Sequence, residues 1–527
     1  MSASEVSRRR FLATGACSGA ALLGLGELPW LRRLGAVSAE EARVPGDIVQ
    51  FRPEIEPLVR LLEETPRERL LEEVAQRTRA GLGYREVLAA IMLAGVRNVH
   101  PGPIAGGKLH IAMVVNSAHM ASLASPPADR WLPVFWAIDH FKVAQAWDVE
   151  DGDWTMPALS DSKLPPSHRA AQAFADAMES WDPEAADRAM AAWVRSASVE
   201  EIYDKLWFYG ARDYLHIGHK AIYCANSYRT LQVIGTEHAE GVLRSLARCL
   251  VICQGGRKPS SDFRTLRPMQ FNQRYVTQLR PGWQHGRDDA GATVDLLATL
   301  REGTSENASA KVVELVNRGV ALQSIWDGFF TAAAEQIMRH PNIFSLHAQT
   351  HTNAMRFAFH TTQDDATRRF LLLQNAAYLA MFRHDSVRRR PTGFTRPEMA
   401  AAGSLVEERI DQLRPDDVTA TAKGAPTVEK IFADLGHDRR RATLGLLASL
   451  EHGTRAESVI DAARLLVFLK GDDTHDYKYS SAIIEDYGHV SPVWRNRFLA
   501  ANLSLLRSSS ASPDNPLTER IRHLFAA

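Results

Sequence analysis

The chain has 527 residues, an apolar fraction of 45% and a formal net charge of zero. This composition excludes a largely disordered chain and a strongly basic nucleic-acid-binding protein, and it provides enough apolar residues for one large core. We therefore expect no nucleic-acid partner.

The first residues resemble an export signal. Residues 7–12 read SRRRFL, a twin-arginine motif, and a weakly apolar stretch rich in Gly and Ala follows at 13–28. The small residues at 37–39 predict cleavage after Ala39. Residues 1–39 are therefore interpreted as a leader for the Tat export machinery. Glu27 interrupts the apolar stretch, which is too short for a permanent membrane anchor of roughly 20 residues. The sequence predicts a periplasmic or extracellular protein; a chance arginine pair is the alternative.

Beyond the leader, helical periodicity dominates the chain. The sequence shows no series of alternating strands separated by hairpin turns. We predict an all-α fold, a single multi-helix domain of stacked helical hairpins at residues 45–527. Apolar residues recur at spacings of three and four at 67–78, 84–96, 131–146, 239–251, 310–338, 366–381, 439–450 and 456–469.

The cysteines do not form a disulfide framework. Cys17 would leave with the leader, which leaves an odd number, and neither CxxC nor CxxCH occurs. Cys249 and Cys253 are one helical turn apart, and we interpret them as core residues rather than metal ligands.

Histidines introduce four of the predicted helices. His110, His216, His347 and His475 each lie near a predicted helix start, and a partner helix begins about 19 to 23 residues later. Such units would stack as helical hairpins. The chain has 19 histidines, so some will start a helix by chance. Scattered structural histidines are therefore the alternative to one shared site.

The second unit, DYLHIGHKAIYCAN at 213–226, is predicted to form one continuous helix. Residues three and four apart share a helix face, which aligns a polar stripe between apolar flanks. If buried, the stripe needs a ligand, a metal or a structural hydrogen-bond network; a solvated face is the other possibility. The stripe consists of Arg212, His216, His219, Tyr223, Asn226 and Thr230.

The third and fourth units add further candidates. His347 and His351 are one turn apart, a spacing with which two imidazoles can bind one metal ion or form a structural pair. No glutamate lies between them, which disfavours a zinc hydrolase. Asp473, His475 and Lys478 cluster at a predicted helix start, where the Asp side chain would cap the helix.

In the first unit, His119 is about half a turn out of phase with His110, so the two cannot face one point. On the partner helix, Asp139 and His140 are neighbours. They form either an oriented imidazole or a surface pair, and we favour the surface pair.

Taken in order, these segments resemble the questin oxidase-like family. The likeness extends over residues 105–505 and is thin between the motifs; Met355 and the HKA at 219–221 depart from the family pattern. The motifs are a histidine-bearing helix near residue 110, LHIGHKAIYCANSYRTL, SLHAQTHTNAMRFAF and DDTHDYKYSSAI. They match the family at His110, His216, His219, His347, Thr350, Ala354, Arg356, Asp473, His475 and Lys478.

This resemblance implies a Baeyer–Villiger-type oxidase that acts on polycyclic aromatic ketones or quinones with molecular oxygen and NADPH. Because reduced nicotinamide is scarce outside the cytoplasm, an exported relative is expected not to use NADPH freely.

We therefore hypothesise an exported, oxygen-dependent oxidoreductase that acts on an aromatic or quinone-like small molecule in a histidine-lined cavity. Neutral imidazoles would hold a transition metal ion, with iron as the first candidate, or act as acid–base groups. Lys478 or Arg356 would stabilise an oxyanion. Two alternatives stay open: a helical binding or scaffold protein with structural histidines, and a helical protein that binds haem or a metal non-covalently.

The predicted residues fall into three sets. The catalytic set is His216, His219, His347, His475, Lys478 and Arg356; the cofactor-binding set is Tyr223, Asn226 and Thr350; and the metal-binding set is His110, His216, His347, His351 and His475.

Overall fold

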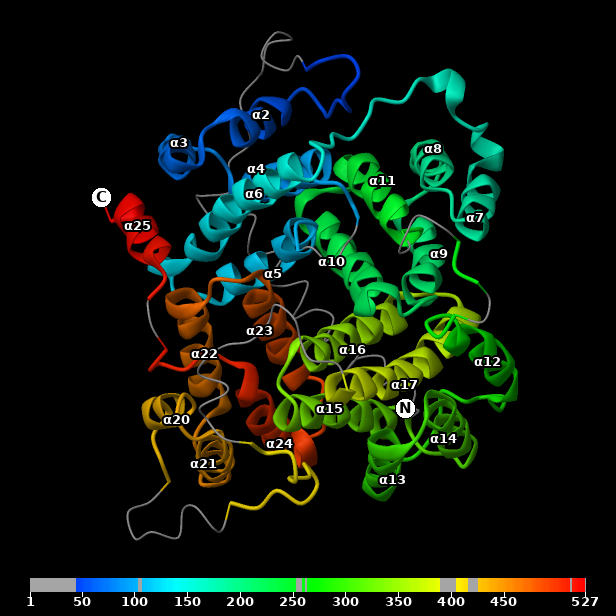
Figure 1. Ribbon diagram of the computed structural model, residues 1–527, viewed down its shortest axis with the longest axis vertical. Coiled ribbons are helices and arrows are strands. Elements are labelled where there is room, and N and C mark those ends of the chain that lie inside the picture. The colour runs from blue at the N-terminus through cyan, green and yellow to red at the C-terminus, as the bar shows by residue number, and fades with distance from the viewer. Residues whose placement is uncertain are drawn as a thin grey trace, which may run out of the picture.

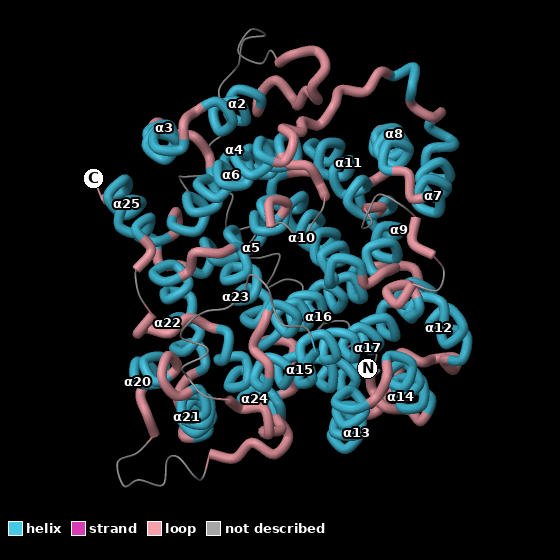
Figure 2. Tube along the Cα trace, viewed as in Figure 1, coloured by secondary structure: helices cyan, strands magenta, loops and turns pink. Residues whose placement is uncertain are grey.

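The computed structural model describes residues 44–102, 107–252, 258–260, 263–388, 404–415, 425–511 and 514–526. The predicted leader at 1–39 and Cys253 lie outside these ranges. Within them the chain forms 22 α-helices and no β-strand, which confirms the all-α prediction (Figures 1 and 2). Among the described residues, none of the helices combines the length and the apolar character that a membrane crossing requires.

The helices follow one another with mostly short connections. The first half of the chain contains α2 (Glu56–Glu64), α3 (Arg67–Arg79), α4 (Tyr84–Asn98), α5 (His110–Ala124), α6 (Leu132–Glu150), α7 (Ala170–Ser180), α8 (Pro183–Val194), α9 (Val199–Ala211), α10 (His219–Ile234) and α11 (Ala239–Leu250). The second half contains α12 (Arg267–Tyr275), α13 (Ala290–Glu302), α14 (Ser305–Asn317), α15 (Leu322–Arg339), α16 (Ile343–Thr361), α17 (Asp365–Arg388), α20 (Val428–Asp434), α21 (Arg439–Glu451), α22 (Ala456–Lys470), α23 (Thr474–Tyr487), α24 (Pro492–Asn502) and α25 (Pro516–Phe525).

Four helices form a closed ring at the centre of the molecule. α5 packs on α10, α10 on α16, α16 on α23, and α23 packs back on α5 (Figure 1). Side-chain bonds fix their relative register: Asn226 donates to the Met113 carbonyl at 2.9 Å, and Asn353 donates to Glu485 at 2.9 Å. Residues near the starts of neighbouring helices meet, and so do residues further along, such as Ser117 of α5 with Ser481 of α23 and Asn353 of α16 with Glu485 of α23. The four helices therefore run in the same direction.

The remaining helices cover this ring. Each central helix is followed in sequence by a partner that packs against its outer side: α6 on α5, α11 on α10, α17 on α16 and α24 on α23. The apolar faces between them are largely buried, in one continuous core. Removing this apolar surface from water is the main stabilising contribution to such a fold.

The prediction of continuous helical periodicity across 310–338 was wrong in one respect. The segment contains two helices, α14 and α15, separated at residues 318–321. Gly319 has a φ of +94°, a left-handed conformation that glycine adopts without steric cost and that ends α14.

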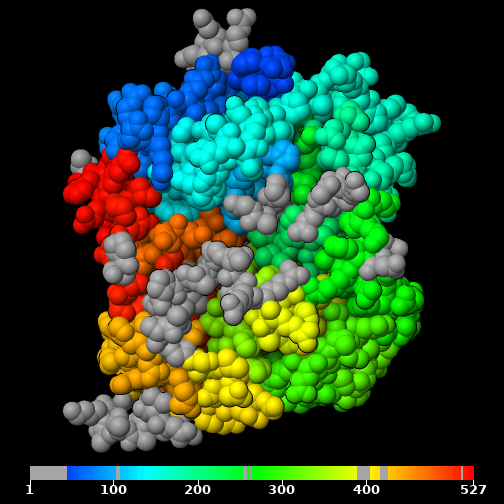
Figure 3. All heavy atoms as spheres, viewed as in Figure 1, coloured from blue at the N-terminus to red at the C-terminus, as the bar shows by residue number. Residues whose placement is uncertain are grey.

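The C-terminal helix packs against an N-terminal helix at the surface. α25, red in Figure 3, lies against the blue N-terminal helices, and it contacts α3 and α6. Arg520 of α25 donates to Glu72 of α3 at 2.7 Å. The C-terminal helix therefore closes over the outer side of α6.

Candidate metal centre

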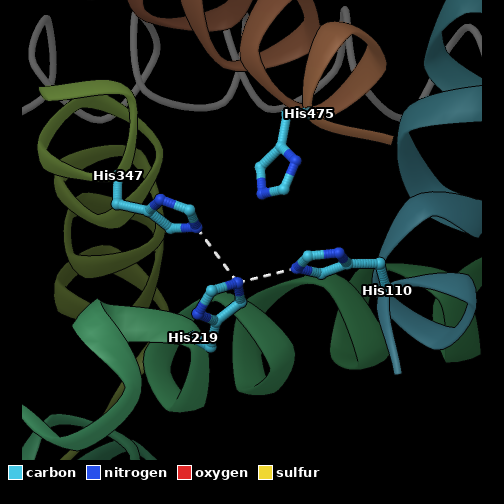
Figure 4. Close-up of side chains that lie close together, drawn as sticks. All are labelled: His110, His219, His347 and His475. Carbon is cyan, nitrogen blue, oxygen red and sulfur yellow. Dashed lines mark hydrogen bonds between the residues drawn. The ribbon is translucent and has the colours of Figure 1, made fainter. Parts of the chain in front are cut away.

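Four histidines converge where the central helices begin. His110 is the first residue of α5, His219 the first of α10, His475 the second of α23, and His347 lies in the second turn of α16. One ring nitrogen of each lies within 4.8 Å of those of the other three, and all four side chains are buried (Figure 4). No other group of three or more His, Cys, Asp or Glu side chains in the described part of the chain is assembled in this way.

Fixed hydrogen-bond partners hold three of the rings. His219 Nδ1 donates to the His216 carbonyl at 2.6 Å, and His347 Nδ1 donates to the Ile343 carbonyl at 2.7 Å. The Nδ1 atom of His475 lies 2.5 Å from Asp473 Oδ1. Because these oxygens can only accept, the proton of each neutral ring is on Nδ1 and the lone pair is on Nε2.

The lone pairs of these rings face one another. His219 Nε2 is 2.7 Å from His110 Nε2 and 3.0 Å from His347 Nε2 (Figure 4). A proton on His110 can satisfy the first contact. The contact between His219 and His347 joins two acceptors at hydrogen-bond distance, which is repulsive unless a cation lies between them. Two nitrogen atoms that bind the same ion, each with a bond of about 2.0 to 2.1 Å, lie roughly 3 to 4 Å apart. The distance between His219 Nε2 and His347 Nε2 is close to this range.

The electrostatics keep the four imidazoles neutral. Burial is the largest cause that lowers the pKa of His110, His219 and His347 well below the ordinary value, and the charge of Lys478 adds to it. Burial also lowers the pKa of His475, although its hydrogen bond with Asp473 opposes that shift. Neutral imidazole is the form that binds metal ions.

A left-handed turn positions His219. His216 and Ile217 have φ values of 58° and 49°, and Gly218 has a φ of 83°. Positive φ is an outlier for a β-branched residue such as Ile217 and costs free energy. The turn places the His216 carbonyl against the Nδ1 atom of His219. Asp213 bridges the two ends of the left-handed turn: it accepts from the Leu215 backbone N–H at 3.0 Å and from Lys220 Nζ at 2.9 Å.

This turn contradicts the predicted helix over 213–226. α10 begins only at His219, so His216 does not share a helix face with His219, and the predicted stripe is broken at its start. The side chain of His216 lies outside the cluster, and only its backbone carbonyl contributes. Three consecutive residues with positive φ cannot continue a right-handed helix.

His351 also lies outside the cluster. Its ring packs near Tyr378 and Phe382, with centroid distances of 5.4 and 5.6 Å. A Cβ atom at Gly218 would lie only 2.7 Å from His351 Cδ2. His351 therefore supports the left-handed turn from behind, and the one-turn spacing from His347 does not bring both rings to one point.

The other predicted residues engage neighbouring groups instead of the cluster. The Tyr223 hydroxyl donates to Ser245 Oγ at 3.0 Å, and the Thr350 hydroxyl donates to the Leu346 carbonyl at 3.3 Å. Asn226 ties α10 to α5, as described above. Arg356 belongs to a separate polar group further along α16, where Asp486 and Glu485 are its charged neighbours.

Lys478 lies next to the cluster, as predicted. It follows His475 by one turn of α23, the residue is 3% exposed, and Nζ has no hydrogen-bond partner among the described residues. Burial lowers the pKa of this amine to about 7, against the opposing charge of Asp473.

A cavity of about 770 Å³ reaches the centre from the outer side of α6. His110 and His475 line its inner end. Trp136, His140 and Trp147 form an aromatic wall in which the rings of Trp136 and His140 are nearly parallel, with centroids 5.2 Å apart. Cavities of this size are typical of small-molecule sites.

The cavity corrects the interpretation of Asp139 and His140 as a surface pair. Asp139 is buried and accepts from Arg67 at 2.7 and 2.8 Å, while His140 stacks on Trp136. None of these three aromatic residues was among the predicted site residues. The available signal was the recurrence of Trp136, His140 and Trp147 at spacings of four and seven residues along the predicted helix.

No protein-family model, curated protein or solved structure matches the chain.

Proposed function

We propose that the chain is an oxidoreductase whose four-histidine cluster binds one transition metal ion and that it acts on an aromatic or quinone-like small molecule. The observation that carries the proposal is the 3.0 Å contact between the Nε2 lone pairs of His219 and His347, with each Nδ1 committed to a carbonyl oxygen. A bound cation turns this repulsive contact into an attractive one.

The ligand set is compatible with a redox-active ion. Four neutral imidazoles suit iron, copper, nickel or zinc, and they leave up to two positions open on a six-coordinate ion such as iron. Ligand histidines in metalloproteins usually donate their second nitrogen to a carbonyl or carboxylate, the arrangement that His219, His347 and His475 have here. When bound, the ion would supply electron transfer and a position for dioxygen.

The cavity supports the substrate class. Its aromatic wall offers flat surfaces for a planar ring system, and its inner end is formed by the edges of His110 and His475. The resemblance to questin oxidase-like proteins points to the same substrates. Export through the twin-arginine leader and any use of NADPH stay predictions.

Metal analysis of the purified full-length chain tests the proposal. We expect about one transition metal ion per chain by elemental analysis. With an aromatic ketone or quinone and an added two-electron reductant, we expect oxygen consumption only in the metal-loaded protein. His110→Ala should lower metal content at least about tenfold, because a ligand is lost. His119→Ala is the matched control: it removes a buried histidine of the same helix, one that contacts Tyr84 at 3.0 Å instead of the cluster.

A folded wild-type chain that takes up no metal after reconstitution with iron, zinc, copper and manganese would contradict the proposal. Equal metal loss in the His110→Ala and His119→Ala variants would also contradict it, because the effect would then be one of folding.

A further inference from the structure

Lys478 carries a buried amine that the protein itself leaves without a partner. Its Nζ atom is inaccessible to solvent and accepts or donates no hydrogen bond among the described residues. Leaving a buried donor unpaired costs about 1 to 3 kcal/mol. The amine lies close enough to the cluster for its charge to lower the pKa of all four histidines, after the larger effect of burial. A ligand bound at the centre would supply this partner.

The helices add to the positive potential at the centre. The ligand histidines lie in the first or second turn of four helices that all begin there. Each helix N-terminus carries about half a positive charge. A divalent ion held by four neutral imidazoles would raise this potential further.

Little negative charge offsets it. Asp473 is hydrogen-bonded to the ligand histidine His475. Asp476, one residue after His475, is already engaged by Arg507 at 2.5 Å. A buried centre with this excess of positive charge favours an anion as an additional ligand.

We propose that the centre binds a small monovalent anion, of the size of azide or formate, which coordinates the metal ion and accepts a hydrogen bond from Lys478 Nζ. This inference rests on the proposed metal centre and adds to it the chemical class of the ligand at the open position. In either protonation state Nζ has N–H groups to donate. Lys478 thereby selects anionic over neutral ligands at the ion.

The test uses the full-length chain loaded with Co²⁺, whose visible d–d bands change when an anion coordinates. Azide is titrated into the wild type, Lys478→Met and Lys478→Gln. We expect Lys478→Met to bind azide about 10 to 100 times more weakly with an unchanged Co²⁺ content, because a charge-assisted hydrogen bond is lost. Lys478→Gln keeps an N–H donor without charge, so its azide affinity should lie between those of the wild type and Lys478→Met. It also replaces Lys478→Met in the test if that variant does not fold.

The control variant is Lys142→Met. Lys142 is a half-buried lysine of α6 whose Nζ atom is bound to the Leu62 and Glu63 carbonyls and to Gln145, so its loss should leave azide affinity unchanged. Equal azide affinity in wild type and both Lys478 variants, with full Co²⁺ content, overturns the inference while leaving the metal centre intact. A wild type that binds no Co²⁺ overturns the metal centre, and the anion site with it.

Discussion

At the scale of single residues, the centre depends on the atoms behind the ligands. Three histidines each have one nitrogen committed to an oxygen, and this leaves the other free to face the cluster. Asp473 has two tasks, since it also caps α23 by accepting from the His475 backbone N–H at 2.7 Å. Burial is the largest single effect and opposes its ionisation, but the hydrogen bonds and charge of His475, together with the charge of Lys478, outweigh burial and hold the pKa of Asp473 below its usual range.

Asp473→Asn should weaken metal binding about tenfold or more, because the amide still caps the helix but no longer provides the negative charge behind His475. Competition with a chelator of known affinity measures the change. Asp472→Asn is the control, since the neighbouring Asp472 is largely exposed and pairs with Arg507. The same loss in both variants would contradict a specific role for Asp473.

At the scale of elements, the left-handed turn before α10 is as important as the helix. Gly218→Ala should strain the backbone at a φ of +83° and drive a methyl group into His351, which displaces the His216 carbonyl from His219. We expect a loss of stability of about 1 kcal/mol or more and weaker metal binding.

Gly319→Ala separates these two effects. Gly319 has a φ of +94° and nothing within 4 Å of its added Cβ, and it lies between α14 and α15, outside the elements that carry the ligands. This variant should lose stability in chemical denaturation but keep wild-type metal affinity. If both variants bind metal as the wild type does, the turn has no part in positioning His219.

Sequence periodicity predicted the helices well and the turn poorly. Apolar spacing reports which face of a helix is buried, and so it located many of the covering helices, among them α6, α11 and α17. The four central helices were predicted instead from the histidines near their starts. The sequence HIG is compatible with helix by spacing, and only packing against His351 selects the left-handed conformation. For the same reason, the sequence could not show which histidine of each pair, His216 or His219 and His347 or His351, is the ligand. A spacing of one helical turn gives no information on the left-handed backbone that separates His216 from His219.

At the scale of the whole molecule, a second polar layer holds the central helices in register. Arg229 of α10 donates to both oxygens of Glu485 at 2.8 Å, and Asn353 of α16 bridges Glu485 and Asp486 at 2.9 Å. Gln349 donates to Asp486 at 2.8 Å. Three of the helices that carry ligand histidines are thus joined a second time, further along their axes.

Asp486 makes the stability of this layer depend on pH. Burial, and then the charge of Glu485, raise the pKa of Asp486 from 3.8 to about 8. The folded state therefore keeps a proton that the unfolded state releases, and this contribution to stability is present below about pH 4 and is lost as pH rises to about 8. Asp486→Asn stays neutral and should become more stable relative to the wild type across this window, by roughly 2 to 5 kcal/mol.

Thermal unfolding of the metal-free wild type and Asp486→Asn at several pH values measures this difference. Comparing the two proteins cancels the opposite contribution of the buried histidines. A difference in stability that does not change with pH would show that Asp486 is ionised in the folded state.

The long separation of the ligands along the chain has a consequence for when the ion enters. His110 and His219 are 109 residues apart, His219 and His347 are 128 apart, and the fourth ligand is on α23, near the C-terminal end. A nascent fragment contains the full set only after synthesis has passed His475, so the ion can be captured only late in synthesis or after it. If the predicted leader sends a folded chain across the membrane, the cytoplasmic metal pool would decide which ion is loaded. Iron would then be bound before the site meets extracellular copper or zinc, which it would otherwise bind more tightly.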